Sequence, residues 1–393
     1  MSSERTTSRA LRVALIGCGN IADDHVHAIR RIANCEIVAV CDRELLMAQQ
    51  LAERFGIKQC FSDVGELLRT TAPEVVHITT PPQSHFALAK QCLNSGCHVY
   101  VEKPFALTAD ETGELLELAD ALNLKVTAGH NLQFTLESQR MRKAIGAGFL
   151  GVKPIHIESY FTYDVGDART LFGSQQHWVK KLPGQLFHNL ISHGIAGLAE
   201  FLDDEIEELT ATAHQSRQRQ QLGTEDILDE LRVLMRDASG TTASFCFSTQ
   251  IKPGLNQLRI YGPVNSIIVD HVTGSLIRNK ARAYKSYLTY FLPPLVNARE
   301  QLRNSRRNIA DFLRRRLYQD SGMKELIERF YNSIRSNGPP PIPYREILLT
   351  ARIMDEIFAQ VYPQRQNAEK PKAEILKDKS DAAEKEKARM VIS

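Results

Sequence analysis

The sequence has no long apolar run, no closely spaced cysteine pair and no strong excess of one charge. None of its apolar stretches approaches the roughly 18 residues of a membrane-spanning helix, and the polar start MSSERTTSRA lacks an apolar signal-peptide core. The net charge of +3 is too small to favour nucleic acid as a partner. The seven cysteines form no C-x-x-C pair, and no histidine, cysteine or carboxylate cluster has metal-site spacing. These absences predict a cytoplasmic protein with reduced cysteines, no transmembrane segment and no metal.

Residues 12–42 carry a complete local pattern of apolar strand, glycine-rich turn, helix and second apolar strand. The turn reads GCGNIA at residues 17–22, which is the spacing G-x-G-x-x-A. Gly17 lets the chain turn sharply, Gly19 leaves room for a pyrophosphate, and Ala22 lets the helix pack closely on the strand. The free N–H groups at the start of the helix favour phosphate. The pattern predicts a dinucleotide-binding site.

An acidic residue at the end of the second strand indicates which dinucleotide is preferred. Asp42 follows Ala22 by 20 residues, where a carboxylate can accept hydrogen bonds from both ribose hydroxyls of an adenosine. The same carboxylate repels a 2′-phosphate, so we expect NAD as the cofactor. NADP remains an alternative, because Arg43 could hold the 2′-phosphate.

Helical and strand patterns alternate from there to about residue 130. Further strand patterns lie at residues 59–61, 75–79, 98–101 and 125–128, with helical patterns at 44–55, 63–72, 84–95 and 108–122. This alternation predicts an α/β Rossmann domain over residues 1–130, built on a doubly wound parallel sheet. Ligands of such folds bind beyond the carboxyl ends of the strands, where the loops 80–82, 102–104 and 129–131 lie.

Lys103 is the strongest catalytic candidate at this edge of the sheet. It follows a predicted strand directly and precedes Pro104, which favours an extended backbone at Lys103. A lysine there can donate a hydrogen bond to a substrate oxygen near the nicotinamide and stabilise the negative charge that develops on it. By itself, the tripeptide E-K-P is also typical of an ordinary surface loop.

A different pattern begins near residue 154. Strand patterns follow one another without intervening helices, at residues 155–162, 206–213, 227–235, 241–249, 255–261 and 266–269. They predict a substrate-binding and oligomerisation α+β domain over residues 131–362, with an open, mostly antiparallel sheet. One face of such a sheet is free for substrate or a partner subunit, so we expect a homodimer or homotetramer.

Residues 284–335 form an arginine-rich helical insertion in this domain. In the predicted helix 299–317, apolar positions including Leu302, Ile309 and Leu313 share one face. Two interpretations are open: a helix that packs on the protein with a solvated basic face, or a surface for anionic lipid or anionic substrates. Helical patterns at 324–335 and 345–361 follow, and the charged residues 363–393 predict a disordered tail.

In this order the motifs resemble the glucose-fructose oxidoreductase, inositol dehydrogenase and MocA family of NAD(P)-dependent oxidoreductases. The resemblance covers residues 11–361 and rests on the glycine loop, CDR at 41–43, TPP at 80–82, GCHVYVEKP at 96–104, GHN at 129–131, PGQLFHNLISH at 183–193, and YG at 261–262. It implies that Lys103 is both catalytic and in contact with the cofactor. With the glycine loop, it predicts cofactor contacts at Gly17, Gly19, Asn20, Ile21, Ala22, Asp42, Arg43, Thr80, Pro81, Pro82, His85, Glu102, Lys103 and Asn131. For His85 and Asn131, a helix cap or a turn residue is the alternative.

The family's second signature, D-x-x-x-H after a glycine-rich run, is altered in this chain. Aligning the family histidine with His193 places Asn189 where the aspartate usually lies. On one helix these positions point the same way. Asparagine can hold a hydroxyl but cannot take its proton, whereas His193 can act as a base near neutral pH. His188 is a further catalytic candidate, although it could instead face the cofactor or support the pocket.

The expected function is reversible hydride transfer between nicotinamide and a secondary alcohol of a sugar, nucleotide sugar or cyclitol. Aromatic and cationic residues in or after the first strand of the second domain are candidates for substrate binding, or alternatively for packing in the sheet and at an interface: Tyr160, Tyr163, Arg169, His177, Trp178 and Lys181. The resemblance leaves open an NAD-dependent glycosidase that oxidises its substrate transiently. The altered signature leaves open a catalytically degenerate, cofactor-binding regulatory or scaffold protein.

Overall fold

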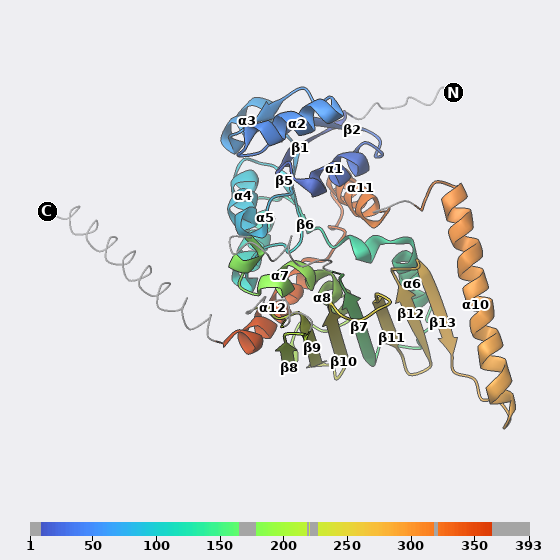
Figure 1. The fold of residues 1–393 in the computed structure, drawn as a ribbon. Coiled ribbons are helices and arrows are strands. Elements are labelled where there is room, and N and C mark those ends of the chain that lie inside the picture. Colours follow the sequence, from blue (N-terminus) through green and yellow to red (C-terminus); the bar gives the residue numbers. More distant parts are fainter. Residues whose placement is uncertain (1–8, 165–177, 218–219, 221–226, 318–320, 364–393) are drawn as a thin grey trace, which may run out of the picture.

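The computed structural model describes residues 9–164, 178–217, 220, 227–317 and 321–363, and its first unit is a six-stranded parallel sheet (Figure 1). The strand order is β3-β2-β1-β4-β5-β6. The strands are β1 Leu11–Ile16, β2 Cys35–Cys41, β3 Cys60–Phe61, β4 Val75–Ile78, β5 His98–Val101 and β6 Val126–Ala128. The order reverses between β1 and β4, and open α/β sheets bind ligands beyond the carboxyl ends at such a point. The predicted doubly wound sheet is confirmed.

Local signals set the ends of the helices that cover this sheet. The helices are α1 Asn20–Ile29, α2 Leu45–Phe55, α3 Val64–Thr71, α4 His85–Asn94 and α5 Ala109–Ala121. Gly56 ends α2 in the left-handed conformation, with φ +59°. Asp63 and Thr108 begin α3 and α5 by accepting hydrogen bonds from the third backbone N–H of each helix. Because these signals are local, the predicted helix limits are within a residue of those observed.

Two late helices connect the first sheet to the rest of the chain. One face of α11, Ser321–Ser336, is buried in the same apolar core as β1 and β4. The next helix, α12, Tyr344–Val361, reaches that core through Ile347 and the core of the second unit through Ile353 and Ile357. The core of the first unit therefore includes side chains from residues that the sequence assigned to the second domain.

The second unit is a mixed seven-stranded sheet in the order β13-β12-β11-β7-β10-β9-β8. Its strands are β7 His156–Thr162, β8 Ile206–His214, β9 Glu230–Asp237, β10 Thr242–Ser248, β11 Asn256–Tyr261, β12 Asn265–Asp270 and β13 Ser275–Lys280. Only β7 and β10 pair in parallel, so the mostly antiparallel prediction is confirmed. One face is covered by α7 Gln185–Leu190, α8 Ser192–Ala199 and α12. The strand β13 and the helix α6, Leu136–Gly146, were not predicted.

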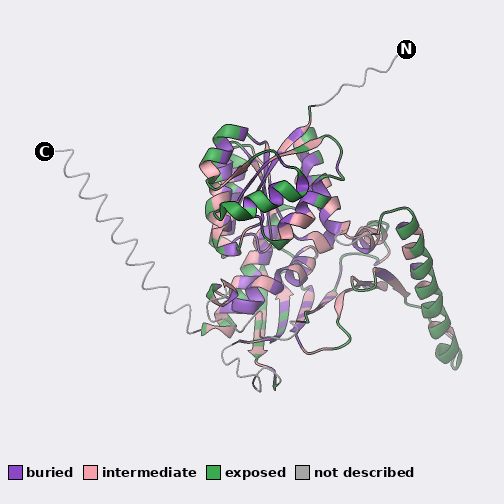
Figure 2. Cartoon of the chain, turned by 45° about the horizontal axis from the view of Figure 1, so that its top comes forward, coloured by how far each residue is buried: buried purple, intermediate pink, exposed green. Residues whose placement is uncertain are grey.

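The first part of the predicted insertion 284–335 forms one long helix, α10, Leu288–Leu313, along the edge strand β13, whereas its second part is α11, which packs on the first unit (Figure 1). The helix α10 begins eleven residues before the predicted start and includes Pro293 and Pro294. Of the two open interpretations, the one in which the apolar face packs on the protein does not hold within this chain, because Leu302, Ile309 and Leu313 are 61%, 58% and 75% exposed. Figure 2 shows the helix as exposed along its length.

Candidate active site

The glycine loop between β1 and α1 leaves an open space before the helix. Gly17 has φ +99°, and a Cβ on it would lie 2.7 Å from the backbone of Thr79 and Thr80. Only glycine fits there, and it brings the loop close to the end of β4. A Cβ on Gly19, the residue that begins α1, would meet no atom within 4 Å. The first N–H groups of α1, at Asn20 and Ile21, can therefore face a phosphate.

Asp42 lies at the end of β2, and its carboxylate is fixed beside this loop. Its Oδ2 accepts a hydrogen bond from the Cys18 N–H at 2.8 Å, and its Oδ1 accepts one from the Glu44 N–H at 3.0 Å. The Arg43 side chain, by contrast, is 92% exposed. An anionic group therefore lies closest to the loop, which is the arrangement that suits a ribose with free hydroxyls.

His85 joins the loop after β4 to the loop after β5. Its Nδ1 lies 2.8 Å from the Pro104 carbonyl oxygen, and its Nε2 lies 2.8 Å from the Thr80 carbonyl oxygen. Burial lowers the pKa of His85, although both carbonyls oppose the shift. Because both ring nitrogens already have partners, His85 orients the two loops. Its predicted contact with the cofactor stays a prediction.

A buried network of polar side chains positions Glu102 and the backbone of Lys103. Glu102 Oε1 lies 3.0 Å from His25 Nε2, and Glu102 Oε2 accepts the Lys103 N–H at 3.1 Å. The network continues from His25 to His77 at 2.9 Å and from His77 to the Tyr331 hydroxyl of α11 at 2.8 Å. Burial would raise the pKa of Glu102, but the bond from His25 and the charge of Lys103 outweigh burial and lower it.

Lys103 reaches across to the helices of the second unit. Its Nζ donates a hydrogen bond to the Asn189 carbonyl oxygen at 3.0 Å. That carbonyl is available because α7 ends at Leu190 and α8 begins only at Ser192, and the last carbonyls of a helix have no partner within it. Burial lowers the pKa of Lys103, and Glu102 opposes this shift.

The structure brings His193 and His130 together next to Lys103. The two imidazole rings are 6.2 Å apart between centroids. Burial, followed by the charges of Lys103 and His130, lowers the pKa of His193 well below its usual value. Burial lowers the pKa of His130 to about 4. Both imidazoles are therefore neutral at pH 7, and a neutral imidazole can accept a proton.

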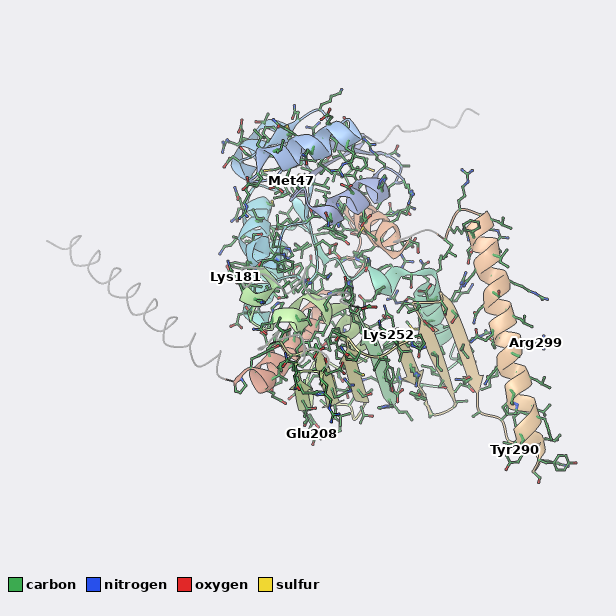
Figure 3. The ribbon with its side chains drawn as sticks, viewed as in Figure 1. Met47, Lys181, Glu208, Lys252, Tyr290 and Arg299 are labelled. Atoms are coloured by element: carbon green, nitrogen blue, oxygen red, sulfur yellow. The ribbon has the colours of Figure 1, made fainter. Side chains whose placement is uncertain are left out.

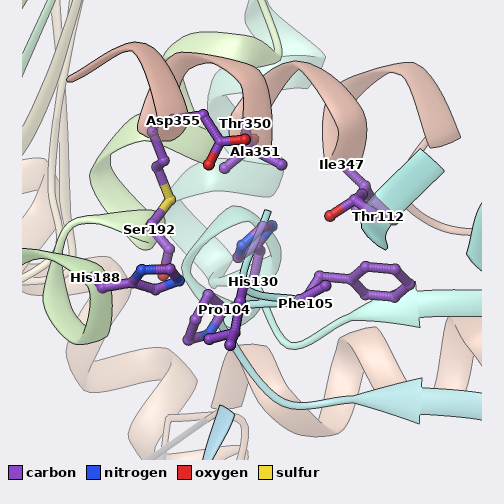
Figure 4. Close-up of a pocket in the computed structure, with 13 residues that line it drawn as sticks. Pro104, Phe105, Thr112, His130, His188, Ser192, Ile347, Thr350, Ala351 and Asp355 are labelled. Carbon is purple, nitrogen blue, oxygen red and sulfur yellow. The ribbon is translucent and has the colours of Figure 1, made fainter. Parts of the chain in front are cut away.

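His188 faces a different cavity from His193. It lines the pocket of Figure 4 beneath the E-K-P loop, with Pro104 and Ser192, and its ring stacks on Phe358 at 5.0 Å. Burial lowers the pKa of His188 to about 4. His193 instead lines a cavity on the side of Ser159, Leu258 and His271. His188 and His193 therefore line separate cavities, although His130 and Ser192 line the pocket of His188 as well. The predicted catalytic role of His188 stays a prediction.

Several buried polar atoms around Lys103 have no hydrogen-bond partner among the described residues. They are His130 Nε2, His188 Nδ1, Ser192 Oγ and His193 Nδ1. Buried polar groups are nearly always paired, so this cluster fits a site whose partners come from a ligand. A nicotinamide and a polyhydroxylated substrate would supply such partners. The sequence had singled out neither His130 nor Ser192, although His130 is part of the G-H-N motif.

The predicted substrate residues are scattered. Tyr160 lies on the opposite face of β7 from Ser159 and Phe161, which face the helices, and Arg259 stacks on its ring at 4.7 Å. Tyr163 and Lys181 are exposed. The Gln83 side chain donates to the Trp178 carbonyl at 3.0 Å, so Trp178 lies near the end of β4. Arg169 and His177 lie outside the described residues.

Within the described ranges, no helix is long and apolar enough to cross a membrane. No three histidine, cysteine or carboxylate side chains in those ranges are grouped as a metal site requires.

The glycine loop, the acidic residue after β2 and the parallel sheet define the first unit as an NAD-binding Rossmann fold. The chain belongs to the GFO/IDH/MocA family: the model of the oxidoreductase family with an NAD-binding Rossmann fold matches residues 11–130, and the family's C-terminal domain matches residues 138–268. The chain is 37% identical over 147 residues to D-glucoside 3-dehydrogenase of Escherichia coli K12, covering 37% of this chain and 42% of that protein. It is 21% identical to myo-inositol 2-dehydrogenase of Thermotoga maritima, over 84% of this chain and 90% of that protein.

Solved structures share the fold. The WlbA dehydrogenase of Bordetella pertussis, in complex with NADH and UDP-GlcNAcA, superposes with a TM-score of 0.72 at 18% identity, over 91% of this chain and 97% of that one. The UDP-N-acetylglucosamine 3-dehydrogenase GnnA of Acidithiobacillus ferrooxidans gives 0.67 at 18% identity, over 90% and 98%. These matches include the second sheet, so they confirm the predicted pairing of a Rossmann unit with an α+β unit.

Proposed function

We propose that this protein is an NAD-dependent dehydrogenase that interconverts a secondary alcohol and a ketone on a sugar, nucleotide sugar or cyclitol. The observation that carries the proposal is that His130 and His193 lie 6.2 Å apart, both within electrostatic reach of Lys103, amid unpaired buried polar atoms at the carboxyl edge of the first sheet. A reacting carbon placed there would have a cation and a neutral base within reach. Family membership supports the same chemistry.

The chain has a group suited to each part of the cofactor. The N-terminus of α1, with Gly17 and Gly19, would hold the pyrophosphate, and Asp42 would accept the ribose hydroxyls. The position of Asp42 and the exposure of Arg43 favour NAD over NADP. When bound, the nicotinamide exchanges a hydride with the substrate carbon.

The protein's own groups would move the proton. His193, neutral at pH 7, takes the proton of the substrate hydroxyl, and the Lys103 ammonium donates a hydrogen bond to the oxygen as its negative charge grows. Asn189 cannot replace the family aspartate as a base, but its amide can hold a neighbouring hydroxyl. His193 therefore has to act as the general base without help from residue 189.

The names of the relatives support the proposed substrate class. Relatives are named as dehydrogenases of a glucoside and of myo-inositol, and one structural neighbour is a UDP-N-acetylglucosamine 3-dehydrogenase. We further propose that residues 1–130 form a Rossmann domain and residues 131–362 a second domain. The open face of the second sheet would form the interface of a homodimer or homotetramer. A cytoplasmic location is favoured by the seven free cysteines.

The test is native mass spectrometry of the purified protein, followed by turnover with NAD and a panel of sugars, cyclitols and nucleotide sugars. We expect NAD to accompany the protein or to bind it, and NADH to accumulate with one class of substrate. Cofactor binding without turnover on any of them would indicate a degenerate enzyme. Turnover without NADH accumulation would instead indicate transient oxidation.

A further inference from the structure

The helix α10 is attached to the protein by its polar side. The Asn304 side chain accepts a hydrogen bond from the Leu276 N–H at 3.4 Å and donates one to the Leu276 carbonyl at 3.1 Å, so it pairs with the open edge of β13. Asn308 donates to the Thr273 carbonyl at 2.9 Å, and Asp311 pairs with Arg140. These contacts fix the rotation of α10 about its own axis.

The opposite side of α10 is apolar and faces outward. The exposed positions along it are Leu288, Phe291, Leu295, Leu302, Ile309, Phe312 and Leu313. Four of them recur every seven residues, from 288 to 309, so they form one stripe. Figure 3 shows Tyr290, which is 80% exposed, and Arg299 pointing away from the sheet. A surface helix ordinarily buries such a stripe, so this one requires another partner.

The surroundings of the stripe are strongly cationic. Residues 278–317 carry eleven lysines and arginines but only two carboxylates, a formal net charge of +9 in a chain of net +3. Both carboxylates, Glu300 and Asp311, are already paired with arginines. A groove of about 1190 Å³ beside α10 reaches from Arg278 of β13 to Leu302 of the stripe, and its lining also includes Arg282, Arg299, Arg303, Arg306 and Arg307. Burial and the neighbouring Arg303, Arg140 and Arg278 lower the pKa of Arg307, and Glu300, a carboxylate that lines the groove, only partly opposes this shift.

We propose that α10 docks this protein on the surface of an anionic phospholipid bilayer. The apolar stripe enters the boundary between headgroups and acyl chains, and the arginines beside it bind lipid phosphates. The aromatic residues Tyr287, Tyr290 and Phe291 at the start of the helix suit the same boundary. The proposal is independent of the dehydrogenase activity.

Charge decides between a membrane and a second copy of the chain. The seven-residue spacing also fits a pair of α10 helices. Pairing two copies, however, would bring two segments of charge +9 together, with Arg299 and Arg306 beside the seam. An anionic bilayer offers the opposite charge and covers the apolar stripe as well.

The test is co-sedimentation of the full-length protein with vesicles of phosphatidylcholine alone and of phosphatidylcholine mixed with phosphatidylglycerol. We expect binding to the anionic vesicles only. Leu302→Gln removes apolar area from the stripe and should lower the partition coefficient about tenfold. Arg303→Gln and Arg306→Gln should each lower it about fivefold.

The matched control is Leu46→Gln on α2, because Leu46 is 64% exposed and Leu302 is 61% exposed. This control should bind vesicles like the unaltered protein, and NAD binding by each variant shows that it is folded. Absence of binding to the anionic vesicles, or equal binding by Leu302→Gln and Leu46→Gln, would overturn the proposal. If the protein does not bind vesicles but forms a dimer that Leu302→Gln dissociates, a second copy of the chain is the partner that covers the stripe.

Discussion

The two sides of the candidate active site differ in how completely their polar groups are paired. On the Rossmann side, Asp42, His85 and Glu102 each use two atoms in hydrogen bonds within the protein. On the side of the second unit, Ser192 and His193 have buried atoms without partners, and so does His130, which reaches the same region from the end of β6. The first side is preorganised to position a cofactor, and the second keeps its hydrogen-bonding capacity for a substrate. Substitutions on the first side should therefore impair NAD binding, and those on the second side should impair turnover.

Replacing His193 with alanine should give the largest loss. We expect kcat to fall about 10³-fold because the base is removed, while NAD binding, which depends on the other side, is unchanged. The measurement is steady-state turnover together with NAD titration. In the unaltered enzyme, the acidic limb of the pH–rate profile should lie below pH 6.5, since the pKa of His193 is lowered. His214→Ala, at an exposed histidine of β8, is the control, and equal activity of the two variants would contradict the assignment.

Lys103→Met should lower kcat/KM about 10²-fold, because a donor to the developing oxyanion is lost. Lys103 joins the two sides, so this variant should also weaken NAD binding, unlike the His193 variant. Lys143→Met, on the surface of α6, provides the matched comparison. Normal turnover by the Lys103 variant would contradict a role for Lys103 in the reaction.

Asp42→Ala should weaken NAD binding about tenfold through the loss of charged hydrogen bonds, and should bring the affinities for NAD and NADP closer together. The kcat at saturating NAD should change little, which separates this side of the site from His193. Titration of both dinucleotides measures the effect, with Glu44→Ala, the exposed neighbouring carboxylate, as the control. An unchanged preference for NAD over NADP would mean that Asp42 does not bind the ribose hydroxyls.

The last prediction concerns stability against pH. His130 and His188 have pKa values of about 4 in the folded protein, below the usual 6.5, because burial disfavours their charged forms. As the pH falls, these histidines therefore become protonated in the unfolded chain at a higher pH than in the folded protein. The free energy of unfolding should fall by about 1.4 kcal/mol per pH unit for each histidine between pH 6.5 and 4. Urea unfolding across this range measures the slope. His188→Asn should make it shallower, and an unchanged slope would contradict the burial argument.

The sequence predicted those parts of the fold and site that depend on local chemistry. The glycine loop, the caps at Asp63 and Thr108 and the run before Pro104 are each encoded within a few residues. The sequence did not predict that His188 and His193 line different cavities. The cavity that each histidine lines depends on how α7 and α8 pack on either side of the break between them. The orientation of α10 was equally hidden: its pattern showed two faces, but only the contact of Asn304 with β13 decides which face is inside.

The packing of α11 has a consequence for how the protein is made. Because Leu326, Phe330 and Tyr331 complete the core around the first sheet, the amino-terminal third of the chain leaves the ribosome without part of its own interior. Tyr331 also ends the hydrogen-bond chain that reaches Glu102 through His77 and His25. Full order at the loop that carries Lys103 must therefore await the last quarter of synthesis, and a nascent chain released early would expose apolar surface to chaperones.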